Sequence, residues 1–181
     1  MKFIKTEIKD LIVVEPKVFG DNRGWFSESY NQQVFKDNGI DITFVQDNHS
    51  FSAQKGVLRG IHFQNNPFPQ TKLVRCTKGR IWDVAVDLRK SSSTYLKWFG
   101  IELTAENHKM LLVPQGFGHG FVTLEENCEV QYKVDNVYDK ALDRSIKYND
   151  PQINIVWPIK DVILSEKDIK APYLKDSDVN F

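Results

Sequence analysis

The sequence predicts an all-β fold, a sandwich or barrel of short strands. Three observations favour it. Short runs rich in Val, Ile, Phe, Tyr and Trp recur between turn residues along the chain. Within several of these runs, apolar and polar residues alternate with the period of two that a half-buried strand requires. Helix signals are few, and neither of the two short segments that show them is long enough to organise the fold.

The alternation is clearest over residues 80–88. One face of that strand carries Trp82, Val84, Val86 and Leu88, and the other carries Ile81, Asp83, Ala85 and Asp87. Residues 97–103, 109–113 and 129–134 have similar patterns, so we expect a strand in each. Turns are predicted where Gly, Pro, Asn, Asp or Ser cluster, at residues 20–24, 78–79, 91–93 and 114–116.

Two short helical segments are predicted. Residues 31–38 fit a short helix with Asn31 at its N-cap and Gly39 ending it. Residues 165–168 fit a capped helical turn that begins with a serine. Pro151 and Pro158 indicate an irregular C-terminal region, because each proline removes a backbone donor and disfavours helix in the residue before it. We expect that region to wrap around the sheets.

Length and composition favour a single domain. The chain has 181 residues, of which 41% are apolar, which is enough for a substantial core. No solenoid repeat, low-complexity segment or long linker divides it. We therefore expect one domain over residues 1–181, with a core of about 1–150 and a wrapping segment of about 151–181.

Charge and cysteine usage narrow the partners and the compartment. The 24 Lys and Arg residues balance the 24 Asp and Glu residues, so neither a nucleic acid nor a membrane surface is an expected partner. Cys76 and Cys128 lie in strand-like runs, which is typical of reduced, packed thiols. The first seven residues mix charges where a signal peptide needs an apolar run, and no apolar stretch is long enough to span a bilayer. A cytoplasmic protein is expected.

The motifs for metal and nucleophile chemistry are missing. The four histidines are His49, His62, His108 and His119, and no two have the spacing that places a pair of ligands on one face of a strand or helix. The sequence also lacks a Gly-x-Ser-x-Gly elbow, a phosphate-binding Gly-x-x-x-x-Gly-Lys loop and a dinucleotide fingerprint. Cofactor-free acid–base chemistry, or simple binding, remains.

Acid–base chemistry needs a base, an acid and a cation that stabilises the anion formed between the two proton transfers. His62 is the candidate base and Tyr132 the candidate acid. Strand periodicity turns Tyr132 inward with Val130, and Lys72 inward with Val74. Strict alternation would place Arg59 and His62 on opposite faces; a bulge at the intervening Gly60 would bring them together.

Each candidate also has a plain structural interpretation. A strand histidine such as His62 is often a satisfied core or edge residue. Tyr132 alone fits a core tyrosine with one hydrogen bond, and Lys72 an edge lysine whose stem is buried. His119, between two glycines, could fill a turn, and Arg23 could be a solvated turn residue. Only their joint pattern separates the two interpretations.

That joint pattern closely resembles the dTDP-4-dehydrorhamnose 3,5-epimerase family. The resemblance runs in order through residues 19–24, 59–64, 70–74, 83–89, 114–121, 132–134 and 164–168. It implies a cupin-like jelly-roll β-sandwich, a homodimer, and no metal or organic cofactor. It also implies inversion at C3 and C5 of dTDP-4-dehydro-6-deoxy-D-glucose, which gives the 4-keto precursor of dTDP-rhamnose for cell-surface polysaccharides.

The resemblance implies roles position by position. His62 matches the base, Asp168 the carboxylate that orients it, Tyr132 the proton donor, and Lys72 the cation beside the developing enolate. Phe26 lies in the same N-terminal motif as the first substrate contact, and Tyr138 matches the aromatic residue that stacks on thymine. The positions that match contacts to nucleotide or sugar are Arg23, Glu28, Gln46, Asp47, Asn48, Arg59, His119, Asp143 and Lys167.

Three alternatives remain open. A single-carbon epimerase or keto-isomerase of a related dTDP-sugar would keep residues like His62 and Tyr132. A non-catalytic nucleotide-sugar-binding sandwich would keep Arg23, Arg59 and Tyr138 and need no acid–base set. A metal-dependent cupin enzyme is disfavoured because the ligand pattern is missing.

Overall fold

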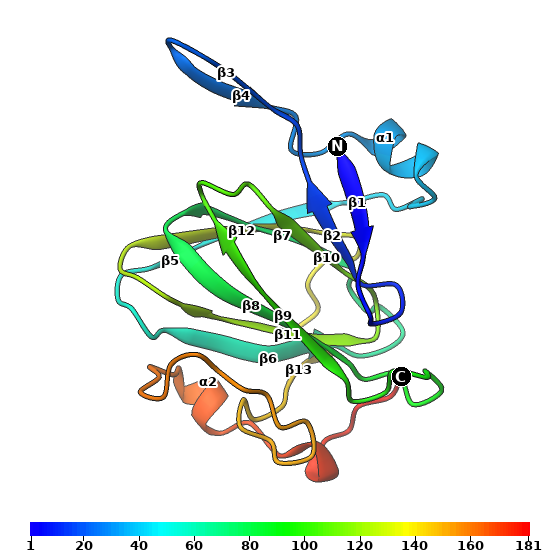
Figure 1. Ribbon diagram of the computed structural model, residues 1–181. Helices are drawn as coiled ribbons and strands as arrows, with labels where there is room; N and C mark the ends of the chain where they lie inside the picture. The colour runs from blue at the N-terminus through cyan, green and yellow to red at the C-terminus, as the bar shows by residue number, and fades with distance from the viewer.

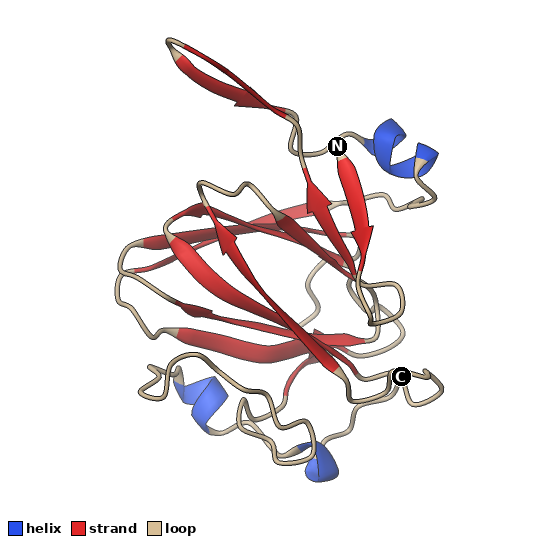
Figure 2. Cartoon of the chain, in the orientation of Figure 1, coloured by secondary structure: helices blue, strands red, loops and turns tan.

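The computed structural model describes residues 1–181 and consists of two antiparallel β-sheets packed face to face (Figures 1 and 2). The six-stranded sheet has the order β1 (Lys2–Lys5), β2 (Ile12–Glu15), β10 (Met110–Val113), β7 (Lys72–Lys78), β12 (Cys128–Val134) and β5 (Gln46–Ser52). The five-stranded sheet has the order β13 (Asp143–Ser145), β6 (Leu58–Gln64), β11 (Phe117–Thr123), β8 (Arg80–Asp87) and β9 (Trp98–Thr104). The all-β sandwich expected from the sequence is confirmed.

The main core lies between the two sheets. Val74 and Leu111 face inward from the six-stranded sheet and meet Ile81 and Phe121 of the five-stranded sheet. Strand β8 shows the predicted alternation. Ile81 and Ala85 enter this core, whereas Val84 and Val86 enter a second apolar cluster on the outer face of the sheet. Two-sided burial therefore accounts for the apolar residues on both faces of β8.

The C-terminal segment covers that outer face. It contains α2 (Glu166–Ile169) and the 3₁₀ helix η1 (Leu174–Asp176), and in Figure 1 it lies beneath the five-stranded sheet. Ile153 and Leu174 bury themselves against Val84 there. The buried carboxylate of Asp150 holds the segment in place, because its Oδ2 accepts a hydrogen bond from the backbone N–H of Leu174 at 2.6 Å.

Both predicted helical segments are confirmed. Helix α1 spans Gln32–Asp37, and the side chain of its N-cap Asn31 accepts a hydrogen bond from the backbone of Val34. Helix α2 begins after its N-cap Ser165, whose side chain accepts from the backbone of Asp168. No helix of the chain has the length and apolarity that crossing a membrane would require.

A two-stranded hairpin projects from the sandwich. Strands β3 (Val18–Asp21) and β4 (Gly24–Ser27) extend away from both sheets, beyond the end that carries α1 (Figure 1). The sequence predicted only the turn at its tip. Its apolar side chains are open to solvent, with Phe19, Trp25 and Phe26 exposed to 52%, 63% and 69%. This hairpin makes no layer of the sandwich.

Candidate active site

A cavity of about 150 Å³ lies between the inner faces of the two sheets. One wall belongs to the six-stranded sheet and the other to the five-stranded sheet. Its lining residues are Ser50, Arg59, His62, Lys72, His119, Phe121 and Tyr132. The base, the acid and the cation inferred from the sequence thus reach one small volume from strands that are distant along the chain.

A bulge in β6 brings Arg59 and His62 to the same face. His62 pairs with His119 of β11, but Arg59 pairs with Phe121, so three steps on β6 oppose two steps on β11. Gly60 lies inside the bulge with a φ of 140°, and a Cβ there would stand 2.5 Å from the Cα of Gly120. Only glycine fits that close approach. The bulge considered at Gly60 is present.

His62 is oriented by a carboxylate from the C-terminal segment. Its Nε2 lies 2.5 Å from Oδ1 of Asp168, a side chain that is only 2% exposed. The other oxygen of Asp168 accepts a hydrogen bond from the hydroxyl of Ser165 at 2.7 Å. With the carboxylate fixed at both oxygens, Nε2 carries the imidazole proton and Nδ1 is the nitrogen free to accept another.

The electrostatics of this pair suit a base that works near neutrality. Burial lowers the pKa of His62, and the hydrogen bond and charge of Asp168 oppose part of that effect. Burial also acts to raise the pKa of Asp168, but the hydrogen bonds from His62 and Ser165 hold it below its ordinary value. Neutral imidazole and ionised carboxylate therefore coexist, and the carboxylate is ready to stabilise an imidazolium.

Lys72 and Tyr132 form the opposite wall. Lys72 is 9% exposed, and its Nζ lies 5.9 Å from the ring centroid of Tyr132. Burial lowers the pKa of Lys72 to about 8, while the charges of Asp143 and Asp83 act in the other direction. Burial raises the pKa of Tyr132, so its phenol stays protonated at neutral pH. The wall offers one cation and one neutral proton donor.

His119 sits beside His62 and is tied to a second carboxylate. Its Nε2 lies 2.9 Å from Oδ1 of Asp83, whose side chain is fully buried. His119 belongs to the middle of strand β11, so the turn considered for it is wrong. The close strand packing explains the flanking glycine, because a Cβ on Gly120 would stand 2.8 Å from the carbonyl oxygen of Arg59.

A chain of hydrogen-bonded polar residues lies near the wall formed by Lys72 and Tyr132. The hydroxyl of Tyr138 donates to Oδ2 of Asp143 at 3.1 Å, and Nζ of Lys167 lies 2.6 Å from the same oxygen. The backbone N–H of Tyr138 donates to Gln46, whose amide in turn donates to Asn48 at 2.8 Å. Tyr138 is 54% exposed, which leaves its ring open for stacking.

The candidate base His62 and the candidate acid Tyr132 come from opposite sheets, and this geometry limits the chemistry. A ring held in the cavity would have His62 on the side of the five-stranded sheet and Tyr132 on the side of the six-stranded sheet. No three His, Cys, Asp or Glu side chains are grouped so as to hold a metal ion. The arrangement can remove a proton from one face of a carbon and return one to the other.

Comparison with known proteins decides the family. The chain matches the family model for dTDP-4-dehydrorhamnose 3,5-epimerase over residues 5–176. The dTDP-4-dehydrorhamnose 3,5-epimerase of Shigella flexneri is 52% identical over 179 residues, which cover 98% of either chain. The protein belongs to the dTDP-4-dehydrorhamnose 3,5-epimerase family. That family consists of isomerases.

Solved structures of the epimerase family agree. The Bacillus anthracis enzyme, crystallised with TDP and pyrophosphate, matches with a TM-score of 0.94 and 49% identity over 96% of this chain and 99% of that one. The Legionella pneumophila enzyme in complex with dTDP-4-keto-L-rhamnose matches with a TM-score of 0.94 and 43% identity over 98% of this chain and 94% of that one. The cupin-like sandwich implied by the resemblance is confirmed.

Four positions expected to contact substrate in an epimerase lie away from the cavity. Arg23 occupies the tip of the projecting hairpin and pairs with Asp21 at 2.5 Å. Phe26 belongs to β4 of that hairpin, and Glu28 follows it and accepts a hydrogen bond from Asn31. These three positions thus lie in the hairpin or directly after it, and the hairpin projects away from the cavity.

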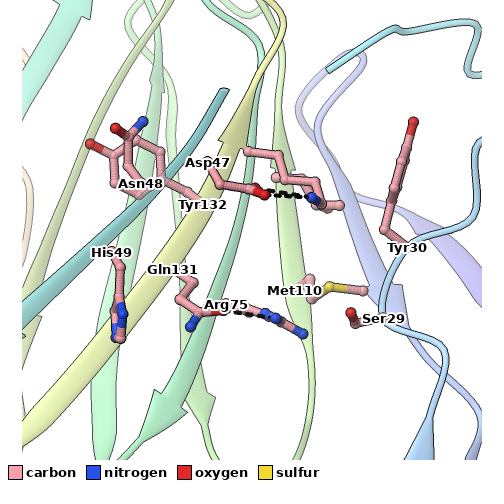
Figure 3. Close-up of a pocket in the computed structure, with 11 residues that line it drawn as sticks. Ser29, Tyr30, Asp47, Asn48, His49, Arg75, Met110, Gln131 and Tyr132 are labelled. Carbon is pink, nitrogen blue, oxygen red and sulfur yellow. Dashed lines mark hydrogen bonds and ion pairs between the residues drawn. The ribbon is translucent and has the colours of Figure 1, made fainter. Parts of the chain in front are cut away.

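Asp47 is the fourth, and its side chain points to the opposite face of the six-stranded sheet. Figure 3 shows it turned away from Tyr132 and Asn48. There it forms an ion pair with Lys133 at 2.9 Å, beside a hydrogen bond from Arg75 to Gln131. Strand periodicity explains the difference, because Asp47 directly precedes the inward-facing Asn48.

Two polar residues, one lining the epimerase cavity and one behind it, escaped the sequence reasoning. Ser50 lines the cavity from β5, where a run of polar residues hides the alternation. Asp83 lies behind His119, and it did carry a signal: the sequence places it on the same strand face as Ile81 and Ala85. A carboxylate on an apolar inner face needs a partner, and that requirement points to a functional site.

Proposed function

We propose that the protein inverts C3 and C5 of dTDP-4-dehydro-6-deoxy-D-glucose and releases dTDP-4-dehydro-L-rhamnose. The observation that carries the proposal is the placement of His62 and Tyr132 on opposite walls of one cavity, with Lys72 beside Tyr132 on the wall of the six-stranded sheet. Inversion requires a proton to leave one face of a ring carbon and another to arrive on the opposite face.

The first step is proton abstraction next to the ketone. Nδ1 of His62 takes the proton, the C–H electron pair moves into the ring, and negative charge develops on the ketone oxygen. A histidine is too weak a base for this step unless that oxygen is stabilised, which the buried Lys72 ammonium can do in a site that excludes water. Asp168 stabilises the resulting imidazolium.

The second step returns a proton from the other wall. Tyr132 donates its phenolic proton to the opposite face of the carbanion, and the electron pair returns from oxygen to form the new C–H bond. Its raised pKa keeps the proton in place until the enolate has formed. Solvent then restores both side chains. No step uses a cofactor.

Binding of the nucleotide uses the polar chain near the wall. Tyr138 offers an exposed ring for the thymine, and Lys167 and Arg59 offer positive charge to the diphosphate. The arginine fork suits phosphate oxygens because it binds them through two donors. Asp143, which accepts from Tyr138 and pairs with Lys167, keeps the two side chains together.

A homodimer accounts for the residues that lie outside the cavity. Arg23, Phe26 and Glu28 reach no site in their own subunit, and the exposed Trp25 and Phe26 give the hairpin an apolar surface that calls for cover. A second copy of the chain would accept the hairpin and receive Arg23 at its own cavity.

The free, buried Cys76 and Cys128 fit a reducing, cytoplasmic setting.

The test is NMR of the 4-keto-6-deoxy substrate incubated with the protein in deuterated water. Deuterium at C3 and C5 together with inversion at both carbons supports the proposal. Inversion at one carbon selects a single-carbon epimerase instead. No exchange, despite tight binding of dTDP, contradicts epimerisation and leaves a nucleotide-sugar-binding protein.

A further inference from the structure

Asp83 is a buried carboxylate that the two proton-transfer steps leave without a role. It lies on β8 with 0% exposure, and its side chain faces the core between the sheets, next to Ile81 and Ala85 in the alternation. An ionised carboxylate in such a place is costly unless it is paired. Its single hydrogen bond goes to Nε2 of His119, at 2.9 Å from Oδ1.

The second oxygen of Asp83 has spare capacity. Oδ2 is buried and accepts no hydrogen bond from any protein group. Lys72 is a buried cation that lines the same cavity as His119. No carboxylate oxygen lies within 4.0 Å of its Nζ. The charge of Asp83 favours the protonated form of Lys72.

The active site therefore contains two imidazole–carboxylate pairs on neighbouring strands. His62 and His119 are direct cross-strand partners, and each turns Nε2 to a carboxylate, Asp168 in one case and Asp83 in the other. Holding Nε2 in this way leaves Nδ1 as the ring nitrogen of His119 that a ligand in the cavity can meet.

We infer that Asp83 is a positioning residue that serves His119 and Lys72 together as the enolate forms. Its Oδ1 fixes the His119 ring with Nε2–H pointing inward. Its negative charge balances a positive His119 and Lys72, so that Nδ1–H of the one and the ammonium of the other both face the developing oxyanion. This inference rests on the proposed function.

Charge balance gives the physical reason. With substrate absent, Asp83 and Lys72 neutralise each other in the core. On substrate binding, Nδ1 of His119 takes up a proton from solvent, its positive charge offsets the negative charge that then develops on the ketone oxygen, and the buried carboxylate stabilises that imidazolium as Asp168 does for His62. Without Asp83, two cations would face each other in a cavity of about 150 Å³, and one of them would lose its proton.

The decisive variant is Asp83→Asn, which keeps the shape and removes the charge. We expect kcat to fall about 100-fold, as for loss of one oxyanion donor, with KM and dTDP affinity within about threefold. Deuterium exchange at C3 and C5 should fall as much as turnover, because enolate formation itself is impaired. The alkaline limb of the kcat profile should move to lower pH, since Lys72 loses the support of Asp83.

Other groups also act on Lys72, and they remain in the variant. Asp143 and Lys167 influence its charge, and Arg59, His62, His119 and Tyr132 share its cavity. The matched control is Asp87→Asn, which alters the only other carboxylate on β8. Asp87 has 0% exposure but is held by Arg89, Ser92 and Thr94, outside the cavity. That variant should lose stability and keep both the kcat and the alkaline limb of the wild type.

A second measurement keeps the inference testable if Asp83→Asn does not fold. In wild-type protein labelled with ¹⁵N-histidine, Nε2 of His119 should be protonated at every pH from 6 to 9. An unprotonated Nε2, or an Asp83→Asn variant with the wild-type kcat and alkaline limb, would overturn the role of Asp83. If the wild-type protein turned over no substrate, the proposed function would be refuted instead. The ¹⁵N measurement needs no substrate, so the two failures can be told apart.

Discussion

His62 of β6 and His119 of β11 face each other across neighbouring strands, and each presents the same ring nitrogen, Nε2, to a buried carboxylate. The carboxylates come from different parts of the chain. Asp168 arrives with the C-terminal segment, whereas Asp83 belongs to the central strand β8. One pair is thus assembled by docking a segment, and the other is built into the sandwich.

Removing the base should abolish exchange of both ring protons. For His62→Ala we expect no deuterium incorporation at C3 or C5 and a dTDP affinity within about tenfold of wild type, because the imidazole contributes to chemistry more than to binding. The measurement is NMR in deuterated water beside a titration with dTDP. Retained exchange at both carbons would remove His62 as the base.

Replacing the acid should separate exchange from turnover. Tyr132→Phe leaves His62 and Lys72 in place, so abstraction proceeds while protonation from the opposite face fails. We expect product formation to fall at least about tenfold more than deuterium exchange. Equal losses in the two assays would show that the phenol mainly shapes the cavity.

The pH dependence of kcat/KM should be bell-shaped. Activity needs neutral His62, whose pKa lies below 6.5, so the acid limb should fall below that pH. It also needs protonated Lys72, so activity should decline as the pH rises through about 8. A Lys72→Arg variant, which cannot lose its proton in this range, should lack the alkaline limb. A limb that persists in it would assign the decline to another group.

The buried charge of Lys72 should lower the free energy of unfolding. Its pKa falls from 10.5 to about 8 on burial, which corresponds to about 3 kcal/mol against folding when it is charged. Between those values the unfolded chain binds the extra proton, so wild-type stability should rise with pH across that window. Lys72→Met should be inactive, more stable at pH 7 and without that rise.

Urea unfolding at several pH values measures the effect, and Lys55→Met on the exposed surface is the matched control. A less stable Lys72→Met would mean that the contacts of the lysine stem outweigh the cost of burying its charge.

Mixed dimers should reveal whether the hairpin serves the partner. Arg23→Ala and His62→Ala homodimers should each be nearly inactive. A heterodimer of the two retains one site with an intact His62 and an intact Arg23 if Arg23 crosses between subunits, so unfolding and refolding the mixture should restore activity. No recovery, with heterodimers present by mass spectrometry, would place Arg23 in its own subunit's site.

Local patterns predicted most of the sandwich and part of the site. The alternation in β12 placed Tyr132 correctly, and the glycine in β6 was compatible with the bulge that unites Arg59 with His62. The His62–Asp168 contact joins residues 106 positions apart, and periodicity carries no information about such a distance. That contact was accessible only through resemblance to a family.

The hairpin was missed for a physical reason. A strand can be predicted from alternating apolar and polar residues when one of its faces is buried. Strand β3 is exposed along its whole length, so its two faces do not differ in this way. The side chains that its neighbour β4 leaves open, Trp25 and Phe26, are apolar without an inner and an outer set.

The dependence of His62 on Asp168 bears on how the protein is made. The segment that delivers Asp168 leaves the ribosome after the strands of both sheets, and it also covers the outer apolar cluster around Val84. A chain interrupted before residue 165 would expose that cluster and lack the carboxylate that holds His62. Premature termination would therefore yield a silent, protease-sensitive product rather than a half-active enzyme that consumes nucleotide sugar.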